Sequence, residues 1–207
     1  MSKRSRCPRC KRPQGHCLCG EIPSLAATIE LLVVQHPSEQ GHALNTARLL
    51  CLGLDTATLL VSEQLPADWD SWLLDPDYRT ELLFPGPDAG ELEVGNDTRP
   101  RRLVLLDGTW RKARKLYYLN PALQQLPQVA LPAGQQSRYR LRKAPGPGAL
   151  STLEAGVVAL GLLEPGRDFT PLLRPFERLI EGQIRAMGEQ TYQAHFAARE
   201  TGNPDKP

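Results

Sequence analysis

Residues 102–110 read RLVLLDGTW, with four consecutive apolar residues followed by an acidic residue, a glycine and a threonine. An uninterrupted apolar run of this kind is typical of a strand that is buried on both faces, as in a parallel sheet. Asp107 ends the run, and Gly108 permits a sharp turn. Thr109 suits the N-cap of a helix that we expect over residues 110–119. The stretch therefore predicts a strand, a turn and a helix.

Strand and helix patterns alternate on both sides of this unit. Apolar runs predict four further strands, over residues 28–34, 57–61, 81–84 and 128–131. Helical spacing predicts three further helices, over residues 43–54, 151–163 and 171–198, with Ser151 and Glu154 spaced as a capping box. Residues 64–78 and 85–100 are expected to be loops, the first with a short helical turn. The alternation predicts an α/β fold with a mainly parallel central sheet flanked by helices.

Length and composition limit the organisation of the chain. Its 207 residues are 41% apolar and 23% charged, which is ordinary for a globular protein with one sizeable core. No apolar run approaches the roughly 20 residues of a membrane helix, and no signal-peptide pattern follows the basic N-terminus. We therefore expect a cytoplasmic protein with no membrane partner. Its expected parts are a metal-binding appendage over residues 1–23, an α/β domain over residues 24–200 and a flexible tail over residues 201–207.

Four of the five cysteines lie close together near the N-terminus, as Cys7-x2-Cys10-x6-Cys17-x-Cys19. In a cytoplasmic chain, this clustering favours a metal site over disulfide bonds. Four thiolates complete a tetrahedral zinc site and leave no open position, so the expected role of zinc is structural. His16 is an alternative ligand. Cys51 lies on the apolar face of a predicted helix and is expected in the core.

The net charge of +2 conceals a strong polarisation. Residues 62–97 hold ten acidic residues and one arginine, whereas cations gather in residues 1–21, 99–115 and 138–143. Three basic clusters, each beside a candidate motif, favour a polyanionic partner such as RNA over a mixed solvated surface. The cations that we expect to contact RNA are Arg48, Arg111, Lys112, Arg114, Lys115, Arg138, Arg140, Arg142 and Lys143.

Two polar residues follow predicted strands at their carboxyl ends, where parallel sheets bind ligands. Asp107 lies at the rim of the core, where desolvation raises the pKa of a carboxyl group and nearby arginines lower it. His36, before Pro37, is a candidate base, hydrogen-bond donor or simple turn residue. The sequence lacks the common phosphate-binding, dinucleotide-binding and hydrolase motifs.

Four ordered motifs resemble the DTW domain family. They are Gln35-His36-Pro37-x-Glu39, Asn45-Thr46-x-Arg48-Leu49-Leu50, Leu106-Asp107-Gly108-Thr109-Trp110 and Ser151-Thr152-Leu153-Glu154-Ala155. The N-terminal cysteine motif is similar to that of bacterial members. The resemblance covers the chain from Cys7 to about Ile184.

This resemblance implies a tRNA-uridine aminocarboxypropyltransferase that uses S-adenosylmethionine. The implied reaction transfers the 3-amino-3-carboxypropyl group to N3 of uridine 47 in the variable loop of tRNA and releases methylthioadenosine. The resemblance also implies a SPOUT-related fold and leaves open whether the cofactor site is knotted.

The resemblance further implies roles for individual residues. Asp107 would take the N3 proton, with His36 as the other candidate catalytic residue and an orienting role as the alternative for Asp107. The donor would contact loops that include Leu106, Gly108, Thr109, Trp110, Leu131, Ser151, Thr152 and Leu153. Two alternative functions are a SPOUT-type RNA methyltransferase and a zinc-containing RNA-binding protein without catalysis. The oligomeric state is left open.

Overall fold

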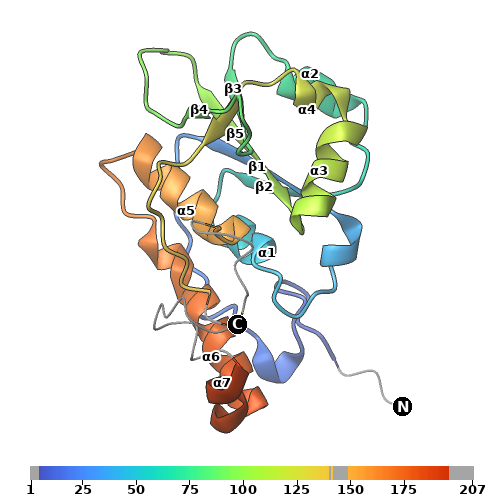
Figure 1. Ribbon diagram of the computed structural model, residues 1–207, viewed down its shortest axis with the longest axis vertical. Coiled ribbons are helices and arrows are strands. Elements are labelled where there is room, and N and C mark those ends of the chain that lie inside the picture. Colours follow the sequence, from blue (N-terminus) through green and yellow to red (C-terminus); the bar gives the residue numbers. More distant parts are fainter. Residues whose placement is uncertain (1–4, 140, 142–148, 196–207) are drawn as a thin grey trace, which may run out of the picture.

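Six parallel strands form the central sheet in the described part of the chain (Figure 1). The computed structural model describes residues 5–139, 141 and 149–195. The strands are β1 (Glu30–Gln35), β2 (Ala57–Val61), β3 (Arg79–Leu83), β4 (Gly90–Glu91), β5 (Arg101–Asp107) and β6 (Gln128–Ala130). Their spatial order is β2-β1-β5-β3-β6-β4, and every pairing is parallel. The predicted α/β fold with a parallel central sheet is confirmed.

Helices cover both faces of the sheet (Figure 1). One face is covered by α1 (Ala47–Gly53) and α5 (Thr152–Leu163), and α6 (Leu173–Met187) packs against α5 and belongs to the same core. The other is covered by α2 (Asp68–Leu73), α3 (Trp110–Leu119) and α4 (Pro121–Gln124). The remaining described helices are α7 (Glu189–His195) and the 3-10 turns η1 (Gln14–His16), η2 (Pro37–Glu39) and η3 (Thr170–Leu172).

Side chains alternate between two cores along each central strand. Leu31 and Val33 join the core beneath α1, α5 and α6, whereas Leu32 and Val34 join the core beneath α2, α3 and α4. Because both faces are covered, the central strands are apolar at nearly every position. This explains the continuous apolar run that precedes Asp107.

Local sequence determines how β5 passes into α3. Gly108 has a φ of +155°, and a Cβ at this position would lie 3.0 Å from the Cβ of Lys112, so the turn requires glycine. Thr109 caps α3 by accepting a hydrogen bond from the backbone N–H of Lys112. At the start of α5, Ser151 and Glu154 form the predicted capping box.

Two predicted helices have different bounds in the structure. The helix expected over residues 171–198 is divided into η3, α6 and α7, because Gly188, with a φ of +88°, ends α6. Helix α1 begins at Ala47 rather than at residue 43. The preceding turn ends where Asn45 Oδ1 accepts a hydrogen bond from the backbone N–H of Arg48.

The short elements β4 and α4 are absent from the sequence prediction, as are the 3-10 turns η1 and η2. β4 lies in the expected loop over residues 85–100 and pairs with β6. α4 begins at Pro121, where a helix stop was expected, because proline is well tolerated in the first turn of a helix. Elements of two to four residues carry too little periodicity to be recognised.

The N-terminal appendage packs against the α1 and α6 side of the domain. Buried Leu18 and Ile22 belong to the same core cluster as these helices. The domain boundary after residue 23 stays a prediction, and the expected tail over residues 201–207 lies outside the described residues. No helix in the described segments combines the length and apolarity that a membrane crossing requires.

Candidate functional site

Asp107 lies at the carboxyl end of β5, opposite Gln35 at the end of β1. The Nε2 of Gln35 donates a hydrogen bond to Asp107 Oδ2 at 2.8 Å, and the Oγ1 of Thr152 donates to Asp107 Oδ1 at 2.5 Å. Gln35 is fully buried, whereas Asp107 is half-buried. Two neighbouring elements therefore orient the carboxylate at the sheet edge where parallel sheets bind ligands.

Asn45 extends this network toward the N-terminal appendage. The side-chain amides of Gln35 and Asn45 pair through two hydrogen bonds, Gln35 Nε2 to Asn45 Oδ1 at 3.1 Å and Asn45 Nδ2 to Gln35 Oε1 at 3.3 Å. Sequence reasoning placed both residues in motifs but assigned neither a role. Their contact with Asp107 depends on the pairing of β1 with β5, and glutamine in an apolar strand was the only available signal.

His36, the other candidate catalytic residue, is buried next to Gln35. Its ring contacts Glu63 Oε1 through Nε2 at 2.8 Å and Ser38 Oγ through Nδ1 at 2.9 Å. The pKa of Glu63 is lowered, chiefly by the hydrogen bond that Lys115 donates to it. Both ring nitrogens of His36 thus have partners, which favours a positioning role. Glu63 was not recognised from the sequence.

A cavity of about 200 Å³, which we call the β5 cavity, lies at the carboxyl ends of β3, β5 and β6. Five of the eight residues expected to contact a donor line it: Leu106, Gly108, Trp110, Leu131 and Thr152. The other three lie elsewhere, since Thr109 and Ser151 cap helices and Leu153 is buried in the core. The expected donor loops therefore meet around one cavity.

The nine cations expected to contact RNA fall into three groups of three. Three form ion pairs at 2.5–2.8 Å, namely Lys112 with Glu39, Lys115 with Glu63 and Arg138 with Glu177. Within the described segments, no ion pair involves Arg48, Arg111 or Arg114. Arg140, Arg142 and Lys143 lie outside the described residues.

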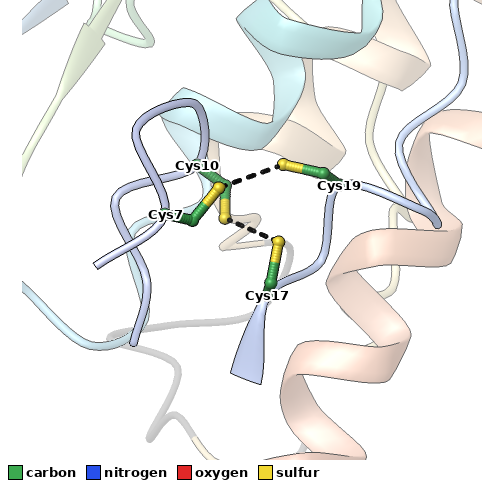
Figure 2. Close-up of side chains that lie close together, drawn as sticks. All are labelled: Cys7, Cys10, Cys17 and Cys19. Carbon is green, nitrogen blue, oxygen red and sulfur yellow. Dashed lines mark hydrogen bonds between the residues drawn. The ribbon is translucent and has the colours of Figure 1, made fainter. Parts of the chain in front are cut away.

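Cys7, Cys10, Cys17 and Cys19 bring their sulfur atoms together, as Figure 2 shows. All four sulfurs lie within 4.8 Å of one another, with Cys7 Sγ 3.5 Å from Cys19 Sγ and Cys10 Sγ 3.8 Å from Cys17 Sγ. Tetrahedral zinc with Zn–S bonds of about 2.3 Å places its sulfur ligands about 3.8 Å apart. The cluster can therefore hold a metal ion such as zinc, and His16 is not part of it.

The surroundings of the cluster favour a thiolate at one position. Hydrogen bonds from the backbone N–H groups of Cys10 and Arg9 lower the pKa of Cys7 to about 6. Burial raises the pKa of Cys19 to about 12, which favours the neutral thiol. A bound metal cation would favour the thiolate instead. Cys51 lies apart from the cluster on α1, where burial raises the pKa of its thiol to about 12.

The sequence profile of the DTW domain family matches residues 4–184. The chain therefore belongs to the DTW domain family, as the four motifs predicted.

Named relatives share most of this length. tRNA-uridine aminocarboxypropyltransferase 2 of Drosophila melanogaster is 37% identical over 194 residues, which cover 88% of this chain and 76% of the fly protein. The Mus musculus protein of the same name is 35% identical over 193 residues, covering 88% of this chain and 65% of the mouse protein. tRNA-uridine aminocarboxypropyltransferase A of Arabidopsis thaliana is 26% identical over 196 residues, covering 79% and 74% of the two chains. No solved structure matches the chain significantly.

Proposed function

We propose that this chain transfers the 3-amino-3-carboxypropyl group of S-adenosylmethionine to N3 of a tRNA uridine. The names of its relatives support the reaction and the substrate class. The observation that carries the proposal is the Asp107 carboxylate, which Gln35 and Thr152 orient beside the β5 cavity.

The residues of the β5 cavity fit the adenosyl part of this donor. Trp110 is 39% exposed, and the centroid of its ring lies 6.1 Å from that of Phe84. Both residues line the cavity. Aromatic faces stack on nucleobases, and mainly apolar walls with a few polar groups are typical of small-molecule sites. Leu106, Gly108, Leu131 and Thr152 would complete the contact with the donor.

The proposed chemistry needs a base and accurate positioning. When bound, the donor would supply a methylene on a sulfonium. Attack of N3 on this methylene would form an N–C bond, break the C–S bond and release methylthioadenosine as the leaving group. A neutral imide is a poor nucleophile, so the N3 proton must pass to a base. We assign the proton to Asp107 and a positioning role to His36.

Further parts of this proposal come from the family resemblance. Uridine 47 in the variable loop is the proposed target, since an unpaired base exposes N3. Zinc in the cysteine cluster is proposed to be structural, because four protein ligands leave no open position. The SPOUT relationship belongs to the same proposal. An experimental structure with the donor bound would test this relationship and show whether the chain is knotted at the donor site.

The proposal is tested by incubating purified protein with bulk tRNA and S-adenosylmethionine, followed by mass spectrometry of small molecules and digested nucleosides. We expect methylthioadenosine and an aminocarboxypropylated uridine. S-adenosylhomocysteine with a methylated nucleoside would identify a methyltransferase instead. No product from zinc-loaded protein that binds tRNA would indicate an RNA-binding protein without catalysis.

A further inference from the structure

A second and larger cavity, which we call the appendage groove, lies between the N-terminal appendage, the turn before α1, and α6. Its volume is about 410 Å³. The lysine and arginine residues that line it are Arg6, Lys11, Arg12, Arg48, Arg178 and Arg185. Among its described lining residues, Glu21 is the one acidic residue, and it is paired with Arg178 at 3.3 Å. The groove is therefore strongly electropositive.

Two of these cations hold the walls of the groove together. Arg12 Nη1 donates a hydrogen bond to the carbonyl of Ala43 at 2.7 Å, and the pair of Arg178 with Glu21 joins α6 to the appendage. Lys11 and Arg185 differ from them, because they are exposed and form no ion pair within the described segments. These two side chains are available to an anionic ligand.

Hydrogen bonds connect the appendage groove to Asp107. Asn45 and Arg48 line the groove, and Asn45 pairs with Gln35, which donates to Asp107 Oδ2. Thr152, which donates to the other carboxylate oxygen, lines the β5 cavity. Asp107 is thus linked through one oxygen to the apolar cavity and through the other to the basic groove.

We propose that the appendage groove binds the phosphate backbone of the RNA substrate and leads it to Asp107 from the side opposite the donor. Cations that neutralise phosphates supply most of the sequence-independent affinity for RNA. The α3 surface is a weaker candidate, because pairing with glutamates leaves only two of its four cations without an ion pair among the described residues. In the described segments, Arg178 is the only one of the six groove cations that forms an ion pair. This inference rests on the proposed function for its substrate, and it assigns the appendage a part in RNA binding.

The test compares two double variants that each remove two positive charges. Lys11→Gln with Arg185→Gln alters opposite walls of the groove, whereas the control, Arg167→Gln with Arg174→Gln, alters exposed cations that do not line it. Binding of an unmodified tRNA transcript is measured across a salt series without donor. At about 0.1 M salt we expect the groove variant to bind roughly tenfold more weakly, and its salt slope to fall by about two. The control variant should change affinity by less than about threefold.

Unchanged zinc content and melting temperature of the groove variant would show that the appendage is intact. Affinity like that of the wild type, or equal losses in both double variants, would overturn the proposal. Binding of polyglutamate to the wild type as tightly as tRNA would also overturn it, since the groove would then accept any polyanion. If the wild type released no methylthioadenosine while the groove variant still lost tRNA affinity, the proposed reaction would fail and the groove assignment would stand.

Discussion

Strands β1 and β5 carry a polar pair at each end of their contact, and the two pairs differ. At the amino end Glu30 lies opposite Arg102, and at the carboxyl end Gln35 lies opposite Asp107. The first pair is an ion pair, with Nε and Oε2 2.9 Å apart. In the second pair a carboxylate accepts a hydrogen bond from a neutral amide at 2.8 Å. The same two strands thus pair a charge with an opposite charge at one end, and with a neutral hydrogen-bond donor at the other.

At the amino end of the β1–β5 contact, aromatic rings and carboxylates enclose the Arg102 guanidinium. The Arg102 side chain is only 7% exposed, and its guanidinium lies 3.2 Å from the ring centroid of Tyr78 and 4.4 Å from that of Trp72. It also pairs with Asp75 at 3.4 Å. Ring stacking and ion pairs fill the space that a ligand would need, so this end contributes to stability.

The carboxyl end orients the Asp107 carboxylate beside the β5 cavity and connects it to the appendage groove through hydrogen bonds. Neither Gln35 nor Thr152 carries a charge, so their hydrogen bonds to Asp107 fix the carboxylate without an opposite charge of their own. The β5 cavity and the appendage groove are linked to this carboxylate through Thr152 and Asn45. The network around Asp107 adjoins a cavity that can take a ligand, which indicates a functional role. The network around Arg102 is enclosed by aromatic rings and ion pairs, which indicates a role in stability.

The largest expected effect is on the reaction rate, and it distinguishes the carboxyl end of the β1–β5 contact from the amino end. Asp107→Asn should lower the single-turnover rate by about a thousandfold, because general base catalysis contributes roughly that much. Its free energy of unfolding should stay within about 1 kcal/mol of the wild type, since the side-chain volume is kept. Asp75→Asn at the amino end is the matched control and should leave the rate unchanged. Equal rate losses in both variants would remove the functional distinction.

A second variant should affect stability instead. Arg102→Met removes the stacked guanidinium and leaves Glu30 and Asp75 without their cation. We expect chemical denaturation to show a loss of about 2 kcal/mol, because a desolvated cation–π contact contributes about that much. The single-turnover rate per folded molecule should match the wild type. A slower rate at unchanged stability would contradict the structural role of this end.

The smallest expected effects come from a matched pair of threonines. Thr152→Val removes the hydroxyl that donates to Asp107 and should lower the turnover rate by about ten- to a hundredfold, since a hydrogen bond to a charged group contributes roughly 1.5–3 kcal/mol. Thr80→Val in β3 removes a buried hydroxyl that has no hydrogen-bond partner among the described residues. It should raise the free energy of unfolding by about 1 kcal/mol at unchanged rate. Similar effects of the two substitutions on rate would show that Thr152 has no special relation to Asp107.

Patterns that are local in the sequence predicted their structures well. The strand, turn and helix around Asp107, the capping box at Ser151 and the cysteine cluster each lie within one short continuous stretch of the chain, so spacing alone identified them. The Gln35 and Thr152 contacts could not be predicted in this way. Gln35 lies 72 residues before Asp107 and Thr152 lies 45 residues after it, so only the order of the strands and helices brings them together.

Charge clusters were the least informative part of the sequence. Lys112 and Lys115 are separated from Glu39 and Glu63 by 73 and 52 residues, yet they pair with them in the fold. Clustering along the chain does not reveal such partners. The cations of the appendage groove come from three distant segments, which only the tertiary structure assembles.

The most direct test of the role of Asp107 is to measure the binding of both ligands to the Asp107→Asn variant. Isothermal titration would follow S-adenosylmethionine and unmodified tRNA separately, in the wild type and in the variant. We expect both dissociation constants to stay within about threefold of the wild type while the turnover rate falls about a thousandfold, because Asp107 would act on the proton at N3. A loss of affinity for either ligand as large as the loss of rate would contradict this role and make Asp107 a binding residue.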